Sequence, residues 1–262
     1  MLQFQNYIRA ESLEQAYTLN QNRRARVLGG MLWLRTEGGT AGTAIDLSGL
    51  GLDTIEETPD GWSIGAMATL RALELHPGLN GLTGGAFAAA LGPIVGVQFR
   101  NLATVGGSVW GRFGFSDVLT LLLALDAQVE LYKAGRMPLA RFAELPPDRD
   151  LLVRVLVPGA PVTVRYQAAR IARTDLPLLT CAAVLPQSGA PRVVVGARPM
   201  RAMTVADPDG LLANGLTPDA IKAFAAHAAA AVPTGSNSRG SAAYRTHLVK
   251  VLTTRALGGL LK

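Results

Sequence analysis

Cysteine is almost missing from this sequence, since Cys181 is the only one among its 262 residues. A single thiol forms no intramolecular disulfide. It also excludes an iron–sulfur cluster or a cysteine-rich zinc site built by this chain alone. Any redox chemistry therefore needs another cofactor.

Histidine is scarce as well, because only His76, His227 and His247 occur and they are far apart in the sequence. The chain contains no HExxH, GxSxG, P-loop or GxGxxG pattern. These absences remove the usual support for a zinc protease, a serine hydrolase, a nucleotide kinase or a Rossmann protein.

Lysine supplies only four of the 25 basic residues, so the formal charge of +6 comes almost wholly from arginine. A nucleic-acid-binding protein is expected to gather its cations on a stripe or arm. Here only Arg23, Arg24 and Arg26 crowd together. The pattern argues against nucleic acid and suits phosphates or acidic partner surfaces.

Long apolar runs are missing, the longest being Val118 to Leu125. A membrane helix needs roughly 20 apolar residues, and the N-terminus has no hydrophobic signal core. We therefore expect no membrane span and a cytoplasmic location. Apolar residues nevertheless make up 49% of the chain and charged residues 17%, which favours a protein with a large buried core.

Several local signals predict elements. Ser12 and Gln15 form a capping-box signature for a helix, and Asp60-Gly61 is a hairpin turn signal. Prolines at 158 and 161 indicate an edge strand that ends at a domain boundary. Strands are expected in 26–28, 44–50, 62–67, 128–132, 151–158, 162–171, 179–186 and 191–199. Helices are expected in 13–22, 31–37, 68–76, 219–232 and 241–261. The apolar run that begins at residue 117 turns into the alternating pattern of a strand. Residues 103–109 are expected to form a glycine loop.

Two glycine pairs are the strongest candidates for function: Leu28-Gly29-Gly30-Met31-Leu32 and Thr104-Val105-Gly106-Gly107-Ser108. A Gly-Gly pair can turn several backbone N–H groups toward an anion, and without a Cβ a diphosphate can approach closely. A tight turn is the alternative for each pair alone. Two pairs about 75 residues apart, the second flanked by Arg100-Asn101 and Ser116-Asp117, favour an anion site.

The sequence resembles the FAD-binding subunit of molybdenum hydroxylases, the middle subunit in carbon monoxide dehydrogenases and bacterial xanthine dehydrogenases. Residues 100–108 are similar to the family pattern R-N-x-A-T-[IV]-G-G-N, and Asp117 and the stretch 121–131 follow. Further matches lie at 44–50, 62–70, 170–175 and 239–257. The resemblance thus spans nearly the whole chain.

The resemblance implies an α+β protein with a two-subdomain FAD-binding (PCMH-type) fold and a C-terminal domain of antiparallel sheet and helices. Its expected boundaries are 1–56 for the first FAD-binding subdomain, 57–161 for the second and 162–262 for the C-terminal domain.

The resemblance also implies a site. Main-chain amides of residues 28–32 and 104–108 would hold the diphosphate of FAD, and the Asp117 carboxylate would accept hydrogen bonds from cofactor hydroxyls. Arg170 falls where the family often has a lysine near the flavin. No catalytic residue for an organic substrate and no metal ligand is expected.

The sequence departs from the family in three places. Met31, Leu32 and Trp33 follow the first glycine pair where a hydroxyl-bearing residue is usual, and Ser108 replaces an asparagine. Residues 110–115 read WGRFGF, where relatives more often have small and polar residues around a proline. Trp110, Phe113 and Phe115 either stack on the flavin ring or fill space that the cofactor occupies in relatives.

The resemblance implies an electron-transfer flavoprotein subunit. A large partner carrying molybdopterin would oxidise the substrate, and a small partner with two-iron two-sulfur clusters would relay electrons to the FAD of this chain. The alternative is a cofactor-free scaffold that keeps the fold and holds the complex together. The sequence leaves the substrate and the electron acceptor open.

Overall fold

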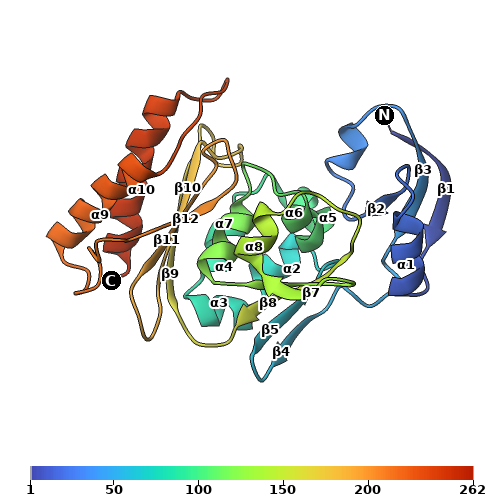
Figure 1. Ribbon diagram of the computed structural model, residues 1–262, viewed down its shortest axis with the longest axis horizontal. Coiled ribbons are helices and arrows are strands. Elements are labelled where there is room, and N and C mark those ends of the chain that lie inside the picture. Colours follow the sequence, from blue (N-terminus) through green and yellow to red (C-terminus); the bar gives the residue numbers. More distant parts are fainter. Residues whose placement is uncertain (1, 262) are drawn as a thin grey trace.

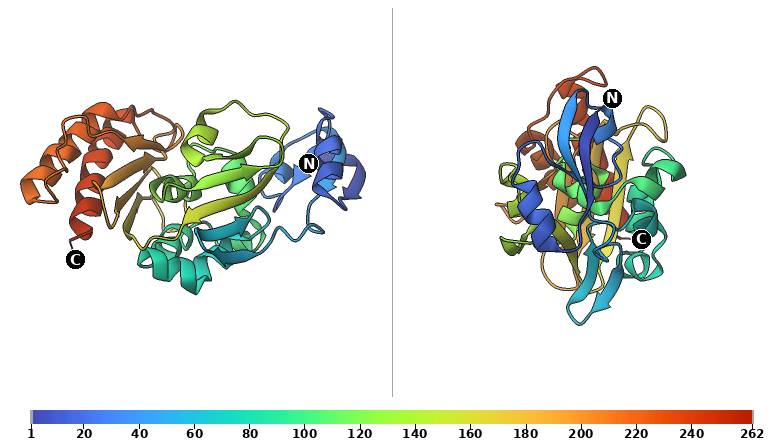
Figure 2. Two further views of the ribbon diagram at one scale, coloured as in Figure 1. Left: turned by 60° about the horizontal axis from the view of Figure 1, so that its bottom comes forward. Right: turned by 90° about the vertical axis from the view of Figure 1, so that its right-hand side faces the viewer.

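The computed structural model describes residues 2–261, and it places three sheets in a row along the long axis (Figure 1). The N-terminal sheet has the strand order β1-β3-β2 and the middle sheet the order β4-β5-β8-β6-β7. The C-terminal sheet has the order β12-β11-β10-β9. The left view of Figure 2 shows the same succession, with β1 and the helices α9 and α10 at opposite ends of the molecule.

The N-terminal part is a small parallel sheet with one helix. Its elements are β1 (Gln3–Arg9), α1 (Leu13–Asn20), β2 (Arg26–Leu28), the 3-10 turn η1 (Leu34–Thr36) and β3 (Thr40–Asp46). Ser12 caps α1, since its Oγ accepts a hydrogen bond from the amide of Gln15 at 3.1 Å. The predicted β-α-β-like unit is confirmed, while the short helix expected over 31–37 is reduced to one 3-10 turn.

The middle part combines a five-stranded sheet with seven helices of the described chain. Its strands are β4 (Ile55–Thr58), β5 (Gly61–Gly65), β6 (Gln128–Leu131), β7 (Gly135–Pro138) and β8 (Leu152–Pro158). Its helices are α2 (Leu70–Leu75), α3 (Pro77–Thr83), α4 (Ala86–Leu91), α5 (Val97–Leu102), α6 (Val105–Trp110), α7 (Asp117–Ala124) and α8 (Leu139–Glu144). The predicted hairpin is confirmed, and Gly61, the first residue of β5, has a φ of +139°, a conformation that favours glycine.

The structure corrects two expectations for this part. The strand before the prolines is not an edge strand, because β8 pairs with β5 on one side and with β6 on the other. Pro158 is tolerated there because it is the last residue of β8, beyond the ladder that β8 forms with β6. The predicted glycine loop is also wrong, since residues 105–110 form helix α6 with Thr104 as its N-cap.

The C-terminal part is an antiparallel sheet with helices on one face. Its elements are β9 (Thr163–Ala169), β10 (Leu179–Leu185), β11 (Arg192–Gly196), β12 (Met203–Val205), α9 (Pro218–Ala231) and α10 (Ala242–Gly259). The short strand β12 was not expected from the sequence. Alternate residues of the sheet face opposite ways: Ala182 and Val194 pack with the middle part, and Cys181 and Val195 pack under α9 and α10.

Helix α7 joins the middle part to the C-terminal sheet. All eight of its residues are buried, as expected for a helix that is apolar on every side. Ser116 caps its N-terminus, and Thr120 and Thr180 share a hydrogen bond of 2.9 Å between their hydroxyls. Asp117, the first residue of α7, is therefore fixed next to the C-terminal sheet.

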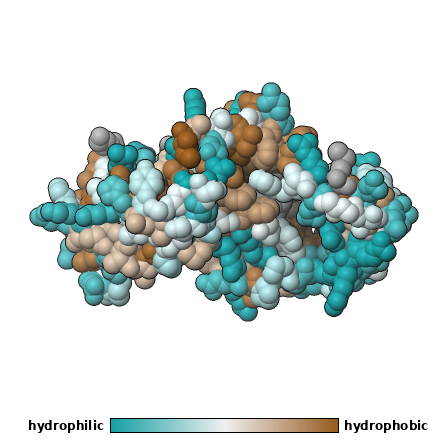
Figure 3. Space-filling view, turned by 90° about the horizontal axis from the view of Figure 1, so that it is seen from above, coloured by the Kyte–Doolittle hydropathy of each residue, from teal (hydrophilic) through white to brown (hydrophobic). Residues whose placement is uncertain are grey.

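The helices of residues 2–261 include none with both the length and the hydropathy that a bilayer crossing requires. Seen from above, apolar side chains gather over the middle of the molecule, beside a hollow where it adjoins the N-terminal part (Figure 3).

Candidate functional site

The two glycine pairs predicted from the sequence lie against each other in the structure. A Cβ built on Gly29 would stand 2.8 Å from Thr104 Oγ1 and 3.8 Å from the Cα of Gly107. A Cβ built on Gly30 would stand 1.9 Å from the carbonyl oxygen of Leu102. The loop after β2 and the start of α6 therefore touch through positions that have no side chain.

The glycines of each pair have different surroundings. A Cβ on Gly106 would stand 2.6 Å from the carbonyl oxygen of Ala66, so Gly30 and Gly106 are both packed against backbone. A Cβ on Gly107 would meet only the Thr104 hydroxyl, at 3.2 Å. Gly30 and Gly106 thus let chain segments approach, while Gly29 lies against Thr104 and Gly107, and Gly29 and Gly107 both border open space.

That open space consists of two adjoining cavities of about 430 and 460 Å³. Both are within the usual size of small-molecule and cofactor sites. Gly29, Thr104, Gly107 and Trp110 contribute to the walls of both. The first cavity extends toward α5 and α7, and the second toward residues 147–152.

The structure brings most of the predicted site residues together on these walls. The first cavity is lined by Gly29, Gly30, Met31, Leu32, Thr104, Gly107, Ser108 and Asp117. The second is lined by Leu28, Gly29, Thr104, Gly106 and Gly107. Two predicted residues lie on neither wall, because Val105 is fully buried in the core and the Arg170 guanidinium is paired behind Asp117.

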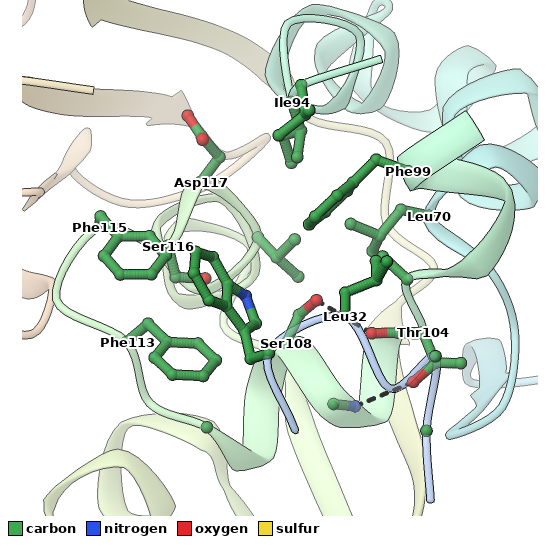
Figure 4. A pocket seen from close by; sticks show the side chains of 18 of the residues that line it. Leu32, Leu70, Ile94, Phe99, Thr104, Ser108, Phe113, Phe115, Ser116 and Asp117 are labelled. Atoms are coloured by element: carbon green, nitrogen blue, oxygen red, sulfur yellow. Dashed lines mark hydrogen bonds between the residues drawn. The ribbon is translucent and has the colours of Figure 1, made fainter. Parts of the chain in front are cut away.

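The two glycine segments differ in whether their backbone amides already donate hydrogen bonds within the protein. In the second segment the amides of Val105 and Gly106 donate to the carbonyls of Ala68 and Ala66, at 2.9 and 2.8 Å. The amide of Gly107 donates to Thr104 Oγ1 at 3.1 Å, which is drawn in Figure 4.

The amide of Ser108 donates to the carbonyl of Thr104 at 3.1 Å. By contrast, within residues 2–261 the amides of residues 29–32 donate to no protein acceptor. The first segment therefore has the amides that remain available for an anion.

Asp117 forms a buried ion pair with Arg170, and the exposed fractions of the two side chains are 5% and 8%. The Tyr166 hydroxyl donates to the same carboxylate oxygen, Oδ1, at 2.6 Å. Burial raises the pKa of the Asp117 carboxyl above its usual range, while Arg170 and Tyr166 act in the opposite direction. In Figure 4 this carboxylate points away from Thr104 and Ser108.

Aromatic side chains form part of the first cavity's wall. Phe113 and Phe115 stack at 5.2 Å between ring centroids, and the Trp33 ring lies 5.7 Å from Phe113 and 5.3 Å from Phe115. The structure thus adds Trp33 to the aromatic residues at 113 and 115. From the sequence, Trp33 is only a departure from the family pattern after the first glycine pair. Trp110 packs instead on Phe142, at 5.7 Å.

The fold and this site define a class, a two-subdomain FAD-binding protein with a C-terminal flavoprotein domain. The family model described as "FAD binding domain in molybdopterin dehydrogenase" matches residues 2–160. The model described as "CO dehydrogenase flavoprotein C-terminal domain" matches residues 165–260. The chain therefore belongs to the FAD-binding flavoprotein family of molybdopterin dehydrogenases, and the family expected from residues 100–108 is confirmed.

Comparisons over the whole chain agree with this family. The protein YgfM of Escherichia coli K12 is 25% identical, over 95% of this chain and 93% of its own length. Carbon monoxide dehydrogenase from Hydrogenophaga pseudoflava contains a chain of similar fold, with a TM-score of 0.87, 24% identity, and coverage of 99% of this chain and 97% of that one. For quinoline 2-oxidoreductase from Pseudomonas putida 86 the TM-score is 0.83, at 21% identity and coverage of 100% and 99%.

Three expectations are confirmed by the family. The fold class is α+β with the two-subdomain FAD-binding arrangement, and the cofactor is FAD. The chain is the flavoprotein component of an oxidoreductase.

The residues on the two cavity walls fit FAD. Gly29 and Gly107 leave a bare backbone surface between the cavities, which a side chain at either position would fill. Beside it stand the available amides of residues 29–32. An elongated cofactor with a central diphosphate suits two cavities that meet at such a surface.

A first prediction separates the packing glycines from the cavity glycines. Gly30→Ala and Gly106→Ala should each lower the free energy of unfolding by about 3 kcal/mol, because the new Cβ would overlap a backbone carbonyl. Gly107→Ala should change it by less than about 1 kcal/mol. Urea unfolding followed by circular dichroism measures the three values, and equal losses would contradict the assignment.

A second prediction concerns the buried ion pair. Asp117→Ala should lower the free energy of unfolding by about 3 to 5 kcal/mol, because it leaves the Arg170 charge buried without its partner. The control is Arg136→Ala, which removes a pair with Glu130 in which the Arg136 side chain is 62% exposed. The control should change stability by about 0.5 kcal/mol. Similar losses in both variants would show that the Asp117 pair contributes no more than a surface pair.

Proposed function

We propose that this chain is the electron-transfer flavoprotein subunit of a molybdenum hydroxylase complex. The observation that carries the proposal is the meeting of Gly29 with Gly107 between two cavities, beside amides that have no protein acceptor within residues 2–261. Bound FAD would supply the redox chemistry, receiving electrons from iron–sulfur centres and passing them to an acceptor.

The chain's own residues bind and orient the cofactor. Amides in residues 28–32 donate to its diphosphate, and those of residues 29–32 are the available ones. In residues 104–108 the Thr104 hydroxyl contributes, since it accepts from Gly107 and keeps its own proton to donate. Gly107 contributes by leaving its cavity face bare.

Asp117 and Arg170 act as a pair in this proposal. Asp117 lies on the first cavity's wall with Oδ1 held by Arg170 and Tyr166, so Oδ2 is the oxygen proposed to accept from a cofactor hydroxyl. Arg170 also donates to the carbonyl of Asp175 at 2.6 Å, which fixes its guanidinium. We propose that Arg170 affects the flavin through Asp117, because it lies on neither cavity wall.

The partners belong to the same proposal. A large molybdopterin-binding subunit would act on the substrate, and a small subunit with two-iron two-sulfur clusters would supply electrons. Cys181 is fully buried, and burial raises the pKa of its thiol to about 12. This thiol is therefore a poor ligand for an iron–sulfur cluster, which supports placing the clusters on a partner subunit. The division at 1–56, 57–161 and 162–262 and the cytoplasmic location stay predictions.

A third prediction tests FAD binding. The purified chain should bind FAD with the visible absorbance of a protein-bound flavin, and Gly107→Val should weaken binding at least about 100-fold, because the branched side chain occupies the surface shared by both cavities. The matched control is Gly81→Val, at a helical position with nothing within 4 Å of a new Cβ. The control should bind FAD normally.

Two results would count against the site or the function. Stoichiometric FAD in the Gly107→Val variant would show that the second glycine pair is only a packing element. A folded wild-type chain that never acquires flavin would favour the cofactor-free scaffold.

A fourth prediction tests the subunit role. The chain reconstituted with FAD should not oxidise purines or aldehydes, because its single buried cysteine cannot build the relay to a molybdenum centre. Purification of the tagged chain from its native host should recover partners that contain iron and molybdenum. Turnover by the chain alone, or its recovery as a monomer without such partners, would reject the subunit role.

A further inference from the structure

The first cavity has an aromatic cluster in its wall that neither glycine pair explains. It consists of Trp33, Phe113 and Phe115, and we refer to it as the aromatic gate. The three rings come from two loops, one following β2 and one between α6 and α7. All three line the cavity, and their centroids are 5.2 to 5.7 Å apart.

The two phenylalanines are held firmly by their own loop. A Cβ on Gly111 would stand 2.3 Å from the Phe113 ring, so this ring lies directly on the backbone at that position. Gly114 lies against Pro199, whose carbonyl oxygen would be 3.1 Å from a Cβ there. The loop thus has packed neighbours on both sides, and Figure 4 shows both phenyl rings beside the cavity.

The tryptophan belongs to the segment 31–37, in which Leu32 packs against the core of the middle part. The backbone hydrogen bonds of residues 31–37 are local, from Arg35 to Met31, from Thr36 to Trp33 and from Glu37 to Leu34. Trp33 itself is 42% exposed. Phe113 and Phe115 are less exposed than Trp33. Trp33 is therefore the ring of the gate that can leave the cluster with the smallest loss of burial.

We propose that Trp33 closes the first cavity by docking on Phe113 and Phe115, and that it must leave them each time FAD enters or departs. The inference rests on the proposed function. It assigns Trp33 as a positioning residue that acts through the two phenylalanines and not by stacking on the flavin. Residues 31–34 line the cavity together, so undocking of Trp33 opens one of its walls.

The gate is expected to affect the association and dissociation rate constants of FAD. A residue that blocks passage slows entry and exit alike, so Trp33→Ala should raise the association and dissociation rate constants of FAD about tenfold each, a size in keeping with two lost aromatic contacts. The equilibrium Kd should stay within about threefold. Trp33→Phe keeps a ring and should give rate constants within about threefold of the wild type.

Stopped-flow flavin fluorescence measures association, and displacement of bound FAD by an excess of a flavin analogue measures dissociation. Tyr244→Ala is the control, since Tyr244 is also exposed (48%) but lies on α10. This control should leave both rate constants unchanged. Phe115→Leu should speed both steps in the same way as Trp33→Ala, and the double variant should be no faster than either single one.

Each other outcome overturns the gate. A faster dissociation with unchanged association would mean that Trp33 contacts the flavin directly. Unchanged rate constants in Trp33→Ala would mean that the cluster has no effect on passage, although the proposed function would stand. Absence of FAD binding by the wild-type chain would reject the proposed function and the gate together.

Discussion

The site depends on one close approach, between the loop that follows β2 and the backbone that leads into α6. Gly30 lies so near the carbonyl of Leu102 that no side chain fits between them, and Gly106 stands in the same relation to Ala66. The first contact holds the N-terminal sheet against the middle part, and the second holds α6 against the segment that follows β5. Gly29 and Gly107 then face each other across the remaining gap, and the two cavities lie on either side of them. A side chain at Gly30 would separate the two parts and remove the surface on which a diphosphate can rest.

The sequence predicted well those elements that local signals define. Ser12 and Gln15 marked the start of α1, and Asp60-Gly61 marked the hairpin. Two of the failures concern how segments are placed in the fold. Pro158 suggested an edge strand, because proline cannot donate a hydrogen bond to a neighbouring strand. The pairing of β8 with β6 ends before Pro158, however, and where that pairing ends depends on the tertiary structure. Gly106 and Gly107 suggested a loop, but a capping threonine and contact with Ala66 fix a helical turn there.

The same distinction applies to the site. The glycine pairs were recognisable because a missing side chain is visible in a sequence, and the resemblance placed Asp117 beside them. No sequence pattern indicated that Trp33 would meet Phe113 and Phe115, because the contact joins segments about 80 residues apart. Nor did it indicate that Arg170 would pair with Asp117, a contact between the C-terminal part and the first residue of α7. Pairings across parts of a fold depend on the relative position of whole sheets, which local signals do not contain.

The residues that depart from the family pattern after the first glycine pair and at positions 113 and 115 line the same cavity. Met31 and Leu32 replace the polar side chains usual after the first glycine pair, so polar contacts there pass to the main chain, whose amides are available. Trp33 and the phenylalanines at 113 and 115 make part of the same wall apolar. Apolar surroundings strengthen each hydrogen bond that a backbone amide makes to an anion, because the local dielectric constant is lower there than in water. A site that has lost hydroxyl donors can therefore keep its hold on a diphosphate, provided that the aromatic wall closes over it.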